Sequence, residues 1–276
     1  MKNGVPIEVL QHIKDAGIFQ IFKAAICQLD HSLINALVER WRLEANTFHL
    51  PIGEATVTLQ DVQVIWCLPI DGPPMTDEWV SETKNVDYWN DLCLEYLGFF
   101  PIDETDHNNL KNGCIKFQTL ASYIHFTNFD SSDAEMCIFM ARRIILAIIG
   151  SELFLDPKTY DVILFFFRNL RDLSREGRKS WGSATLAYLY RNLSKGTTPT
   201  RKGIDGPFLL LQFWAWERMP RIASRVMTRK EERERPYAYQ SCLANRWNRD
   251  HLNLKTPTHV LTSYRSFFNA LTNEQV

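Results

Sequence analysis

One segment, residues 37–72, constrains the fold most, because it predicts a helix, a β-hairpin and a second helix in quick succession. Polar and apolar residues alternate over residues 47–50 and again over 55–58, and the connection at 51–54 contains a proline and a glycine. This pattern predicts a short antiparallel hairpin. Because two strands alone are marginally stable in water, the hairpin requires helices to pack against.

The predicted hairpin has a core face and an exposed turn. Phe48, Leu50 and Val57 are expected to face helices, and their burial is expected to tie the hairpin to the N-terminal helices. The turn is expected to be exposed, and Ile52 and Glu54 in it are predicted partner contacts. An exposed strand edge carries unpaired backbone groups, which can recruit a strand of another protein.

Capping patterns place a helix on each side of the hairpin. The first is predicted to begin after an N-cap at Asp30 and to end before Asn46. Thr58 followed by Asp61 approximates a capping box for the second, which is predicted to stop at Cys67.

Helical patterns dominate the rest of the chain. Further helices are predicted over residues 7–16, 18–27, 86–97, 110–126, 133–153, 162–173, 180–193 and 207–218. By its length alone, the very apolar segment 162–173 could form a strand or a helix, and a helix is favoured because its neighbours are helical. The predicted fold is therefore mainly α, a single compact helical domain with one small β-hairpin.

Composition indicates a globular protein, with 45% hydrophobic residues to supply a core. No apolar run approaches the roughly 18 residues of a membrane span, and the N-terminus lacks a signal-peptide pattern, so a soluble, unexported protein is expected. Six scattered cysteines without a CxxC pair indicate buried thiols in a reducing compartment. The net charge of −1 divides unevenly, because residues 1–120 carry 8 basic and 17 acidic side chains and the remainder carries 23 and 15.

Several motifs resemble the plant mobile domain, a family found in plant transposons and in host proteins similar to MAINTENANCE OF MERISTEMS. The motifs are ERWR (39–42), TFHLP (47–51), TLQDV (58–62), LPIDG (68–72), SWGSATLAYLYRNL (180–193) and LLLQFWAWERMP (209–220). The resemblance assigns residues 1–276 to one such domain. Its C-terminal end is expected to be truncated, because in the family the segment similar to 264–276 continues into a Trp-containing run. Family members usually have glycine where this chain has Cys67, so the end of that helix is expected to differ here.

The resemblance implies a non-catalytic nuclear protein-interaction domain that acts in transposon silencing, genome stability and meristem maintenance, with no cofactor. The implied partner is a phosphatase-7-like protein, because the domain also occurs fused to such phosphatases. The alternative is a nucleic-acid-binding module derived from a transposon protein, with DNA or chromatin as its partner. Contact with a membrane is not expected.

Two further groups of residues are candidate contacts. The Trp and Arg residues of the ERWR and AWERMP motifs are expected to form either a core seam, which is favoured, or an exposed seam where a partner docks. The partner candidates in and next to the second motif are Trp214, Arg218, Arg221 and Arg225. The candidates for nucleic-acid contact are Arg229, Lys230, Arg233, Arg235, Arg246 and Arg249, although interleaved Glu residues also fit a solvated face.

Catalytic interpretations find little support in the sequence. Some family members are labelled aminotransferase-like, but that chemistry needs a Schiff-base lysine and a phosphate loop, of which residues 195–198 are only a fragment. A metal-dependent nuclease could use Asp30, Asp61 and Asp71, but the first two already have predicted capping roles. The prediction is that the chain is not an enzyme, and a degenerate or unrecognised enzyme is the weakest alternative.

Overall fold

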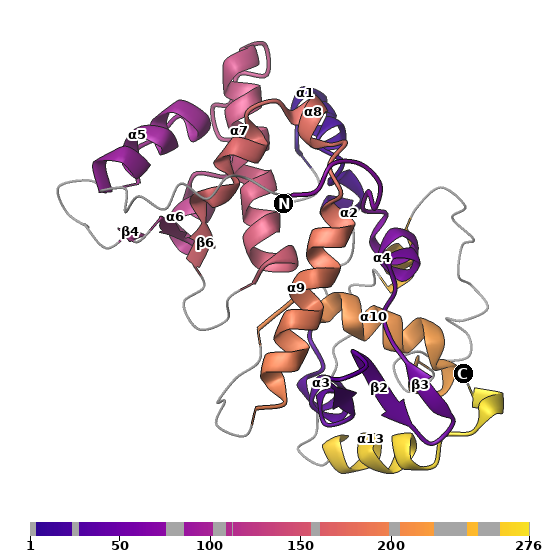
Figure 1. The fold of residues 1–276 in the computed structure, drawn as a ribbon. Helices are drawn as coiled ribbons and strands as arrows, with labels where there is room; N and C mark the ends of the chain where they lie inside the picture. The colour runs from indigo at the N-terminus through magenta and orange to yellow at the C-terminus, as the bar shows by residue number, and fades with distance from the viewer. Residues whose placement is uncertain are drawn as a thin grey trace. The chain divides into compact units, whose positions relative to one another are not determined.

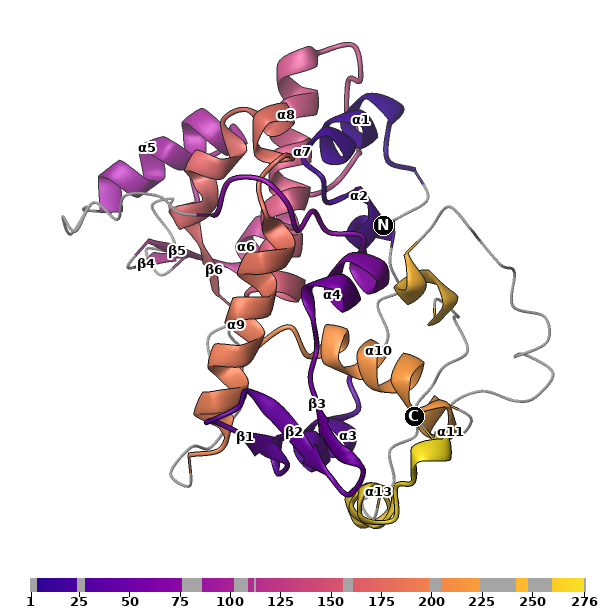
Figure 2. The same cartoon turned by 45° about the vertical axis from the view of Figure 1, so that its right-hand side comes forward.

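The computed structural model describes residues 4–23, 28–75, 86–101, 109–111, 113–155, 161–198, 205–223, 242–247 and 260–275. The chain divides into two compact units. Unit 1 comprises Met1–Lys23 and Asp71–Trp181, and unit 2 comprises Ala24–Ile70 and Gly182–Val276. Each unit is built mainly of helices with one small antiparallel sheet (Figure 1 and Figure 2). The predicted mainly α class is therefore confirmed.

The long helix α7 (Ala134–Ile148) of unit 1 packs against α1 (Ile7–Asp15), α5 (Val86–Leu97) and α6 (Phe117–Ser122). The unit also contains α2 (Phe19–Lys23), α8 (Leu173–Glu176), a π-helix (Ile149–Leu153) that follows α7 directly and a 3-10 helix (Leu164–Leu170). The carboxylate of Asp133 caps α7 by accepting hydrogen bonds from the backbone N–H groups of Glu135 and Met136. On the same helix, Arg142 and Arg143 donate to backbone carbonyls, including that of Leu97 at 2.8 Å from Arg143 Nε. These bonds give the partly buried guanidinium groups their partners.

Unit 1 also contains a sheet that the sequence did not predict. It pairs β4 (Leu110–Lys111), β5 (Cys114–Lys116) and β6 (Asp161–Ile163) in that order. The predicted helix over 110–126 is wrong for its first half, since only Phe117–Ser122 is helical. The segment 162–173 begins in β6 and continues as a 3-10 helix, so the favoured helix is correct for most of it.

Unit 2 contains the predicted hairpin and a second set of helices. Its α-helices are α3 (His31–Val38), α4 (Leu59–Trp66), α9 (Trp181–Gly196, whose first residue belongs to unit 1), α10 (Phe208–Arg218), α11 (Pro220–Ala223) and α13 (Val260–Asn269). Two 3-10 helices span Leu243–Trp247 and Asn273–Gln275. The sheet has the order β1 (Trp41–Arg42), β2 (Thr47–Leu50) and β3 (Gly53–Ala55).

Both helix starts predicted beside the hairpin are confirmed. Asp30 Oδ1 accepts from the Leu33 N–H at 3.0 Å, and Thr58 forms a reciprocal capping box with Asp61. The first helix is shorter than predicted, because it ends at Val38 and the chain then enters β1. The expectation of a different helix end at Cys67 is wrong: this residue takes the left-handed conformation, with φ 52° and ψ 30°.

The core face of the hairpin is buried as predicted. Phe48, Leu50 and Val57 are at most 3% exposed. The Phe48 ring lies 5.0 Å from that of Trp41 and 5.4 Å from that of Trp214, measured between centroids. The indole of Trp41 also donates to Ser194 Oγ at 3.2 Å. The residues that fix the hairpin therefore come from α9 and α10, late in the chain. The predicted tie to the N-terminal helices stays a prediction.

A buried polar network connects the start of α3 to two other helices of unit 2. The backbone N–H of Asp30 donates to Gln212 Oε1 at 2.6 Å, and Gln212 Nε2 donates to the carbonyl of Gln28. Tyr264 on α13 donates its hydroxyl to Asp30 Oδ2. The start of α3 is thus bonded to both α10 and α13. In the part of the chain that the structure describes, no helix combines the length and apolar character needed to cross a bilayer.

Candidate docking site at the hairpin

The turn of the hairpin projects from unit 2. Pro51, Gly53 and Glu54 are exposed and Ile52 is half-buried, which confirms the predicted exposure of the turn. Gly53 has φ +127°, a region that L side chains rarely adopt, and no atom lies within 4 Å of the position that its Cβ would occupy. Open space therefore surrounds the turn at the residue that starts β3.

Strand β3 forms an edge of the sheet, and its central residue presents its backbone outward. The N–H of His49 on β2 donates to the carbonyl of Arg40 at 2.8 Å, so it points toward β1. Since the N–H and C=O of one residue point to the same side of an antiparallel strand, His49 and Glu54 form a non-hydrogen-bonded pair. The N–H and C=O of Glu54 consequently point away from β2, in the direction from which another strand could pair.

The hairpin turn also borders a groove of about 560 Å³. Its lining combines cationic, anionic, polar and apolar residues: Glu39, Arg40, Arg42, His49, Leu50, Pro51, Arg265 and Asn269. These residues come from the end of α3, from the sheet and from α13, which lies against α3. Two segments far apart in the sequence therefore form the groove together.

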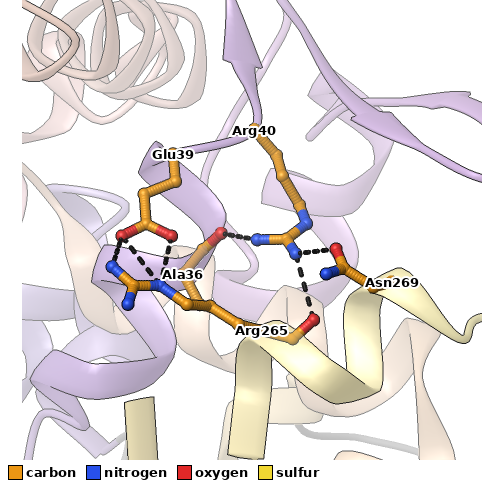
Figure 3. A network of polar contacts seen from close by, with 5 residues as sticks. All are labelled: Ala36, Glu39, Arg40, Arg265 and Asn269. Carbon is orange, nitrogen blue, oxygen red and sulfur yellow. Dashed lines mark hydrogen bonds and ion pairs between the residues drawn. The ribbon is translucent and has the colours of Figure 1, made fainter. Parts of the chain in front are cut away.

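One wall of the groove is a polar network that joins the ERWR motif to α13 (Figure 3). Arg40 donates to the carbonyl of Ala36 at 2.7 Å and to Asn269 Oδ1 at 2.6 Å, and its guanidinium lies 5.0 Å from the Phe268 ring centroid. Arg265 donates to the Glu39 carboxylate, with Nε 2.8 Å from Oε2. The hydrogen bond from Arg265 lowers the pKa of Glu39, and burial lowers the pKa of Arg40. Arg40 and Arg265 thus have structural roles at this wall.

The predicted partner candidates near residue 214 lie in different environments. Trp214 is 2% exposed and packs on Phe48, so its ring offers no surface to a partner. For this residue the structure agrees with the core seam, the alternative that the sequence favoured. Arg218 has an exposed side chain and donates to Asp61 Oδ1 at 2.5 Å. Arg221 is exposed on α11, and Arg225 lies outside the described residues.

The predicted nucleic-acid contacts are not described by the structure. Five of them lie outside the described residues: Arg229, Lys230, Arg233, Arg235 and Arg249. Arg246 belongs to the 3-10 helix Leu243–Trp247, but its side chain is not among those described. These assignments stay predictions.

Two of the carboxylates considered for a nuclease have structural roles. Asp30 caps α3 and accepts from Tyr264, and Asp61 caps α4 and accepts from Arg218. Over the described segments, no three His, Cys, Asp or Glu side chains gather closely enough to hold a metal ion.

The arrangement that stands out is instead a surface for recognition, formed by the exposed turn, the β3 edge and the groove. The groove residues on α13 were missed by the sequence, because nothing local shows that Arg265 meets Glu39.

Comparison with known proteins gives a consistent family. The model of the plant mobile domain matches residues 17–276. Over 212 residues the chain is 41% identical to a serine/threonine-protein phosphatase 7 long form homolog of Arabidopsis thaliana, covering 76% of this chain and 15% of that protein. It is 34% identical to Protein MAIN-LIKE 1 and 30% identical to Protein MAINTENANCE OF MERISTEMS of the same plant, again over 76% of this chain.

The chain spans well under half the length of each of these relatives, 40% of MAIN-LIKE 1 and 42% of MAINTENANCE OF MERISTEMS. No solved structure shows a significant match. The assignment of residues 1–276 to one domain stays a prediction, while the match over 17–276 settles the family. The chain belongs to the plant mobile domain family.

Proposed function

We propose that this chain is a non-catalytic nuclear protein-interaction domain that acts in transposon silencing, genome stability and meristem maintenance, in complex with a phosphatase-7-like protein. The names of the relatives support the proposal, since one is a phosphatase 7 long form homolog and another is named for the maintenance of meristems. The nuclear location and the role in silencing are proposed on the basis of the family resemblance.

The observation that carries the interaction function is the outward backbone of Glu54 on an exposed edge strand. A strand added at this edge would gain main-chain hydrogen bonds without rearranging the hairpin, because the β2–β3 bonds use the groups of Leu50, Gly53, Phe48 and Ala55. The neighbouring turn offers Ile52 as an apolar contact. Together they form a compact docking element on a fixed core.

The experiment compares partner binding by two variants at one residue. Glu54→Pro removes the outward N–H, which proline cannot supply, whereas Glu54→Ala removes only the side chain. Binding to a purified phosphatase-7-like protein is measured by isothermal titration calorimetry, and folding is checked by circular dichroism and thermal unfolding. We expect the proline variant to fold and to lose at least about tenfold in affinity, which equals roughly 1.4 kcal/mol. The alanine variant should bind within about threefold of the parent, because strand pairing uses the backbone.

The Ile52→Ala variant tests the apolar contact at the turn. It should fold as the parent does and weaken binding. Binding by Glu54→Pro at the parent affinity would show that the edge is not the docking element. A phosphatase-7-like protein that does not bind even the parent chain would refute the proposed partner.

A further inference from the structure

The outer face of the hairpin sheet carries two side chains that can donate hydrogen bonds, Arg42 and His49, and both line the groove. Trp41, Phe48 and Leu50 face the core, so strand alternation places Arg42 and His49 on the opposite face. Both are exposed. Among the described residues, the one hydrogen bond of the Arg42 side chain goes to the adjacent carbonyl of Trp41 at 3.3 Å. Arg42 therefore keeps most of its donors for another acceptor.

The groove has a surplus of positive charge. Three arginines and one glutamate line it, which gives a formal charge of +2 with His49 counted as neutral. Glu39 is bonded to Arg265, and Arg40 donates hydrogen bonds to neutral acceptors, the backbone carbonyls of Ala36 and Arg265 and the side-chain oxygen of Asn269. The charge of Arg42 consequently stands without an acidic partner in the described part of the chain.

The shape and lining of the groove favour a protein segment over a nucleic acid. A volume of about 560 Å³ falls within the usual range of ligand sites, roughly 300 to 1,000 Å³, and holds several side chains. The exposed Pro51 adds apolar surface, which a peptide uses and a phosphodiester backbone does not. The carboxylate of Glu39 in the wall would repel a closely spaced row of phosphates.

We propose that this groove binds an acidic segment of a partner protein, with a carboxylate of that segment held by the Arg42 guanidinium and a second contact made by His49. Guanidinium and carboxylate match as a pair of parallel hydrogen bonds. The proposal rests on the interaction function above and adds the chemistry of the partner. Pro51 lines the groove and belongs to the exposed turn, so one continuous segment can reach both.

The test uses a fluorescently labelled peptide of alternating Glu and Gly, with a matched Gln and Gly peptide as its neutral control. Binding to the full chain is followed by fluorescence anisotropy. We expect the acidic peptide to bind, the neutral peptide to bind at least about tenfold more weakly, and added salt to weaken binding. Arg42→Gln should reduce the affinity for the acidic peptide about tenfold or more, as expected when one partner of a charged hydrogen-bonded pair is removed.

A matched control distinguishes the loss of the Arg42 contact from the loss of one positive charge anywhere on unit 2. Arg191 is exposed on α9 and does not line the groove, so Arg191→Gln makes the same charge change elsewhere in unit 2. It should leave peptide binding nearly unchanged. An equal loss in both variants, or full binding by Arg42→Gln, would overturn the assignment of the groove.

The same variants distinguish this inference from the proposed function. If Glu54→Pro abolishes binding of the phosphatase-7-like protein while the acidic peptide fails to bind the parent chain, the groove proposal is wrong and the interaction function stands. A single-stranded oligonucleotide that binds more tightly than the peptide, and loses affinity in Arg42→Gln, would replace the acidic segment by a nucleic acid.

Discussion

The hydroxyl of Tyr264 donates a 2.6 Å hydrogen bond to Oδ2 of Asp30, and it joins two buried side chains that are 234 positions apart. The other carboxylate oxygen of Asp30 caps α3. One carboxylate therefore starts a helix and holds α13 against it. Because the pair is buried, the loss of either partner leaves the other polar group without its bond.

The Tyr264→Phe variant should lower the free energy of unfolding by about 1 to 3 kcal/mol, the usual cost of leaving a buried acceptor unsatisfied. Urea unfolding followed by circular dichroism measures the change. Asp30→Asn alone and together with Tyr264→Phe completes a double-mutant cycle. A coupling energy below about 0.5 kcal/mol would contradict a direct bond between the two side chains.

The Phe48→Ala variant should lower the free energy of unfolding by about 3 to 5 kcal/mol, because the ring is fully buried between Trp41 and Trp214. The control at the turn, Ile52→Ala, should change it by less than about 1 kcal/mol, because Ile52 is half-exposed. Chemical denaturation of both variants measures the difference. Similar losses in the two would show that the turn is part of the core.

The ion pair between Glu39 and Arg265 should add a pH-dependent contribution to stability. Its hydrogen bond lowers the pKa of Glu39 from an ordinary value of 4.5. The stabilisation is therefore complete well above pH 4.5, where an unfolded Glu is fully ionised, and it is lost as the pH falls through the lower folded pKa. The parent should melt slightly above Glu39→Gln at neutral pH, and the gap should close in acid. A gap that widens below pH 4.5 would contradict this sign. The effect should be small, because both side chains are well exposed.

Cys67 should be the more reactive of two neighbouring thiols in unit 2. The Cys242 thiol donates a hydrogen bond to Cys67 that lowers the pKa of Cys67 and raises the pKa of Cys242, which is also buried. Cys67 is exposed. Iodoacetamide followed by peptide mass spectrometry should therefore label Cys67 before Cys242. The Cys242→Ala variant should slow labelling of Cys67 at neutral pH, since the thiolate loses its donor, whereas Cys93→Ala should not. Faster labelling of Cys67 in Cys242→Ala would contradict the hydrogen bond.

Binding to duplex DNA, if it occurs, should be weak and steeply dependent on salt. The evident source is the group of arginines between Arg218 and Arg249, which can neutralise phosphates but forms no recognisable recognition helix in the sequence. Electrophoretic mobility shifts at several salt concentrations measure this. Tight, sequence-selective binding at physiological salt would make the nucleic-acid alternative the leading function.

Local chemistry explains which parts of the fold the sequence predicts. The caps at Asp30 and Thr58 and the turn around Gly53 depend on residues within four positions of each other, so they are visible in the chain. Strand β1 could not be predicted in this way, because Trp41 and Arg42 form a strand only by pairing with β2. The spacing of Trp41 from the apolar residues before it also fits a helix. The Asn112-Gly113 pair was an available signal for the β4–β5 hairpin, since Asn-Gly favours tight hairpin turns and Gly113 has φ +71°.

The site divides in the same way. The exposed turn with Ile52 and Glu54 followed from the hairpin pattern, and the structure places both at the surface. The groove could not be predicted from the sequence, because it depends on the contact between Arg265 and Glu39, which are 226 positions apart. Left-handed Cys67 shows a related limit. The sequence gives the local cost of a non-glycine residue there, but the surrounding packing decides whether the chain accepts that cost.

Because unit 2 combines an early and a late part of the chain, its assembly has a fixed delay during translation. Phe48 leaves the ribosome 166 residues before Trp214, the ring on which it packs. At about 5 to 20 residues per second, the apolar face of the hairpin waits roughly 8 to 33 seconds for that cover. During this interval a nascent chain carries an uncovered two-stranded element with a free edge, so molecular chaperones should engage it before α10 and α13 emerge.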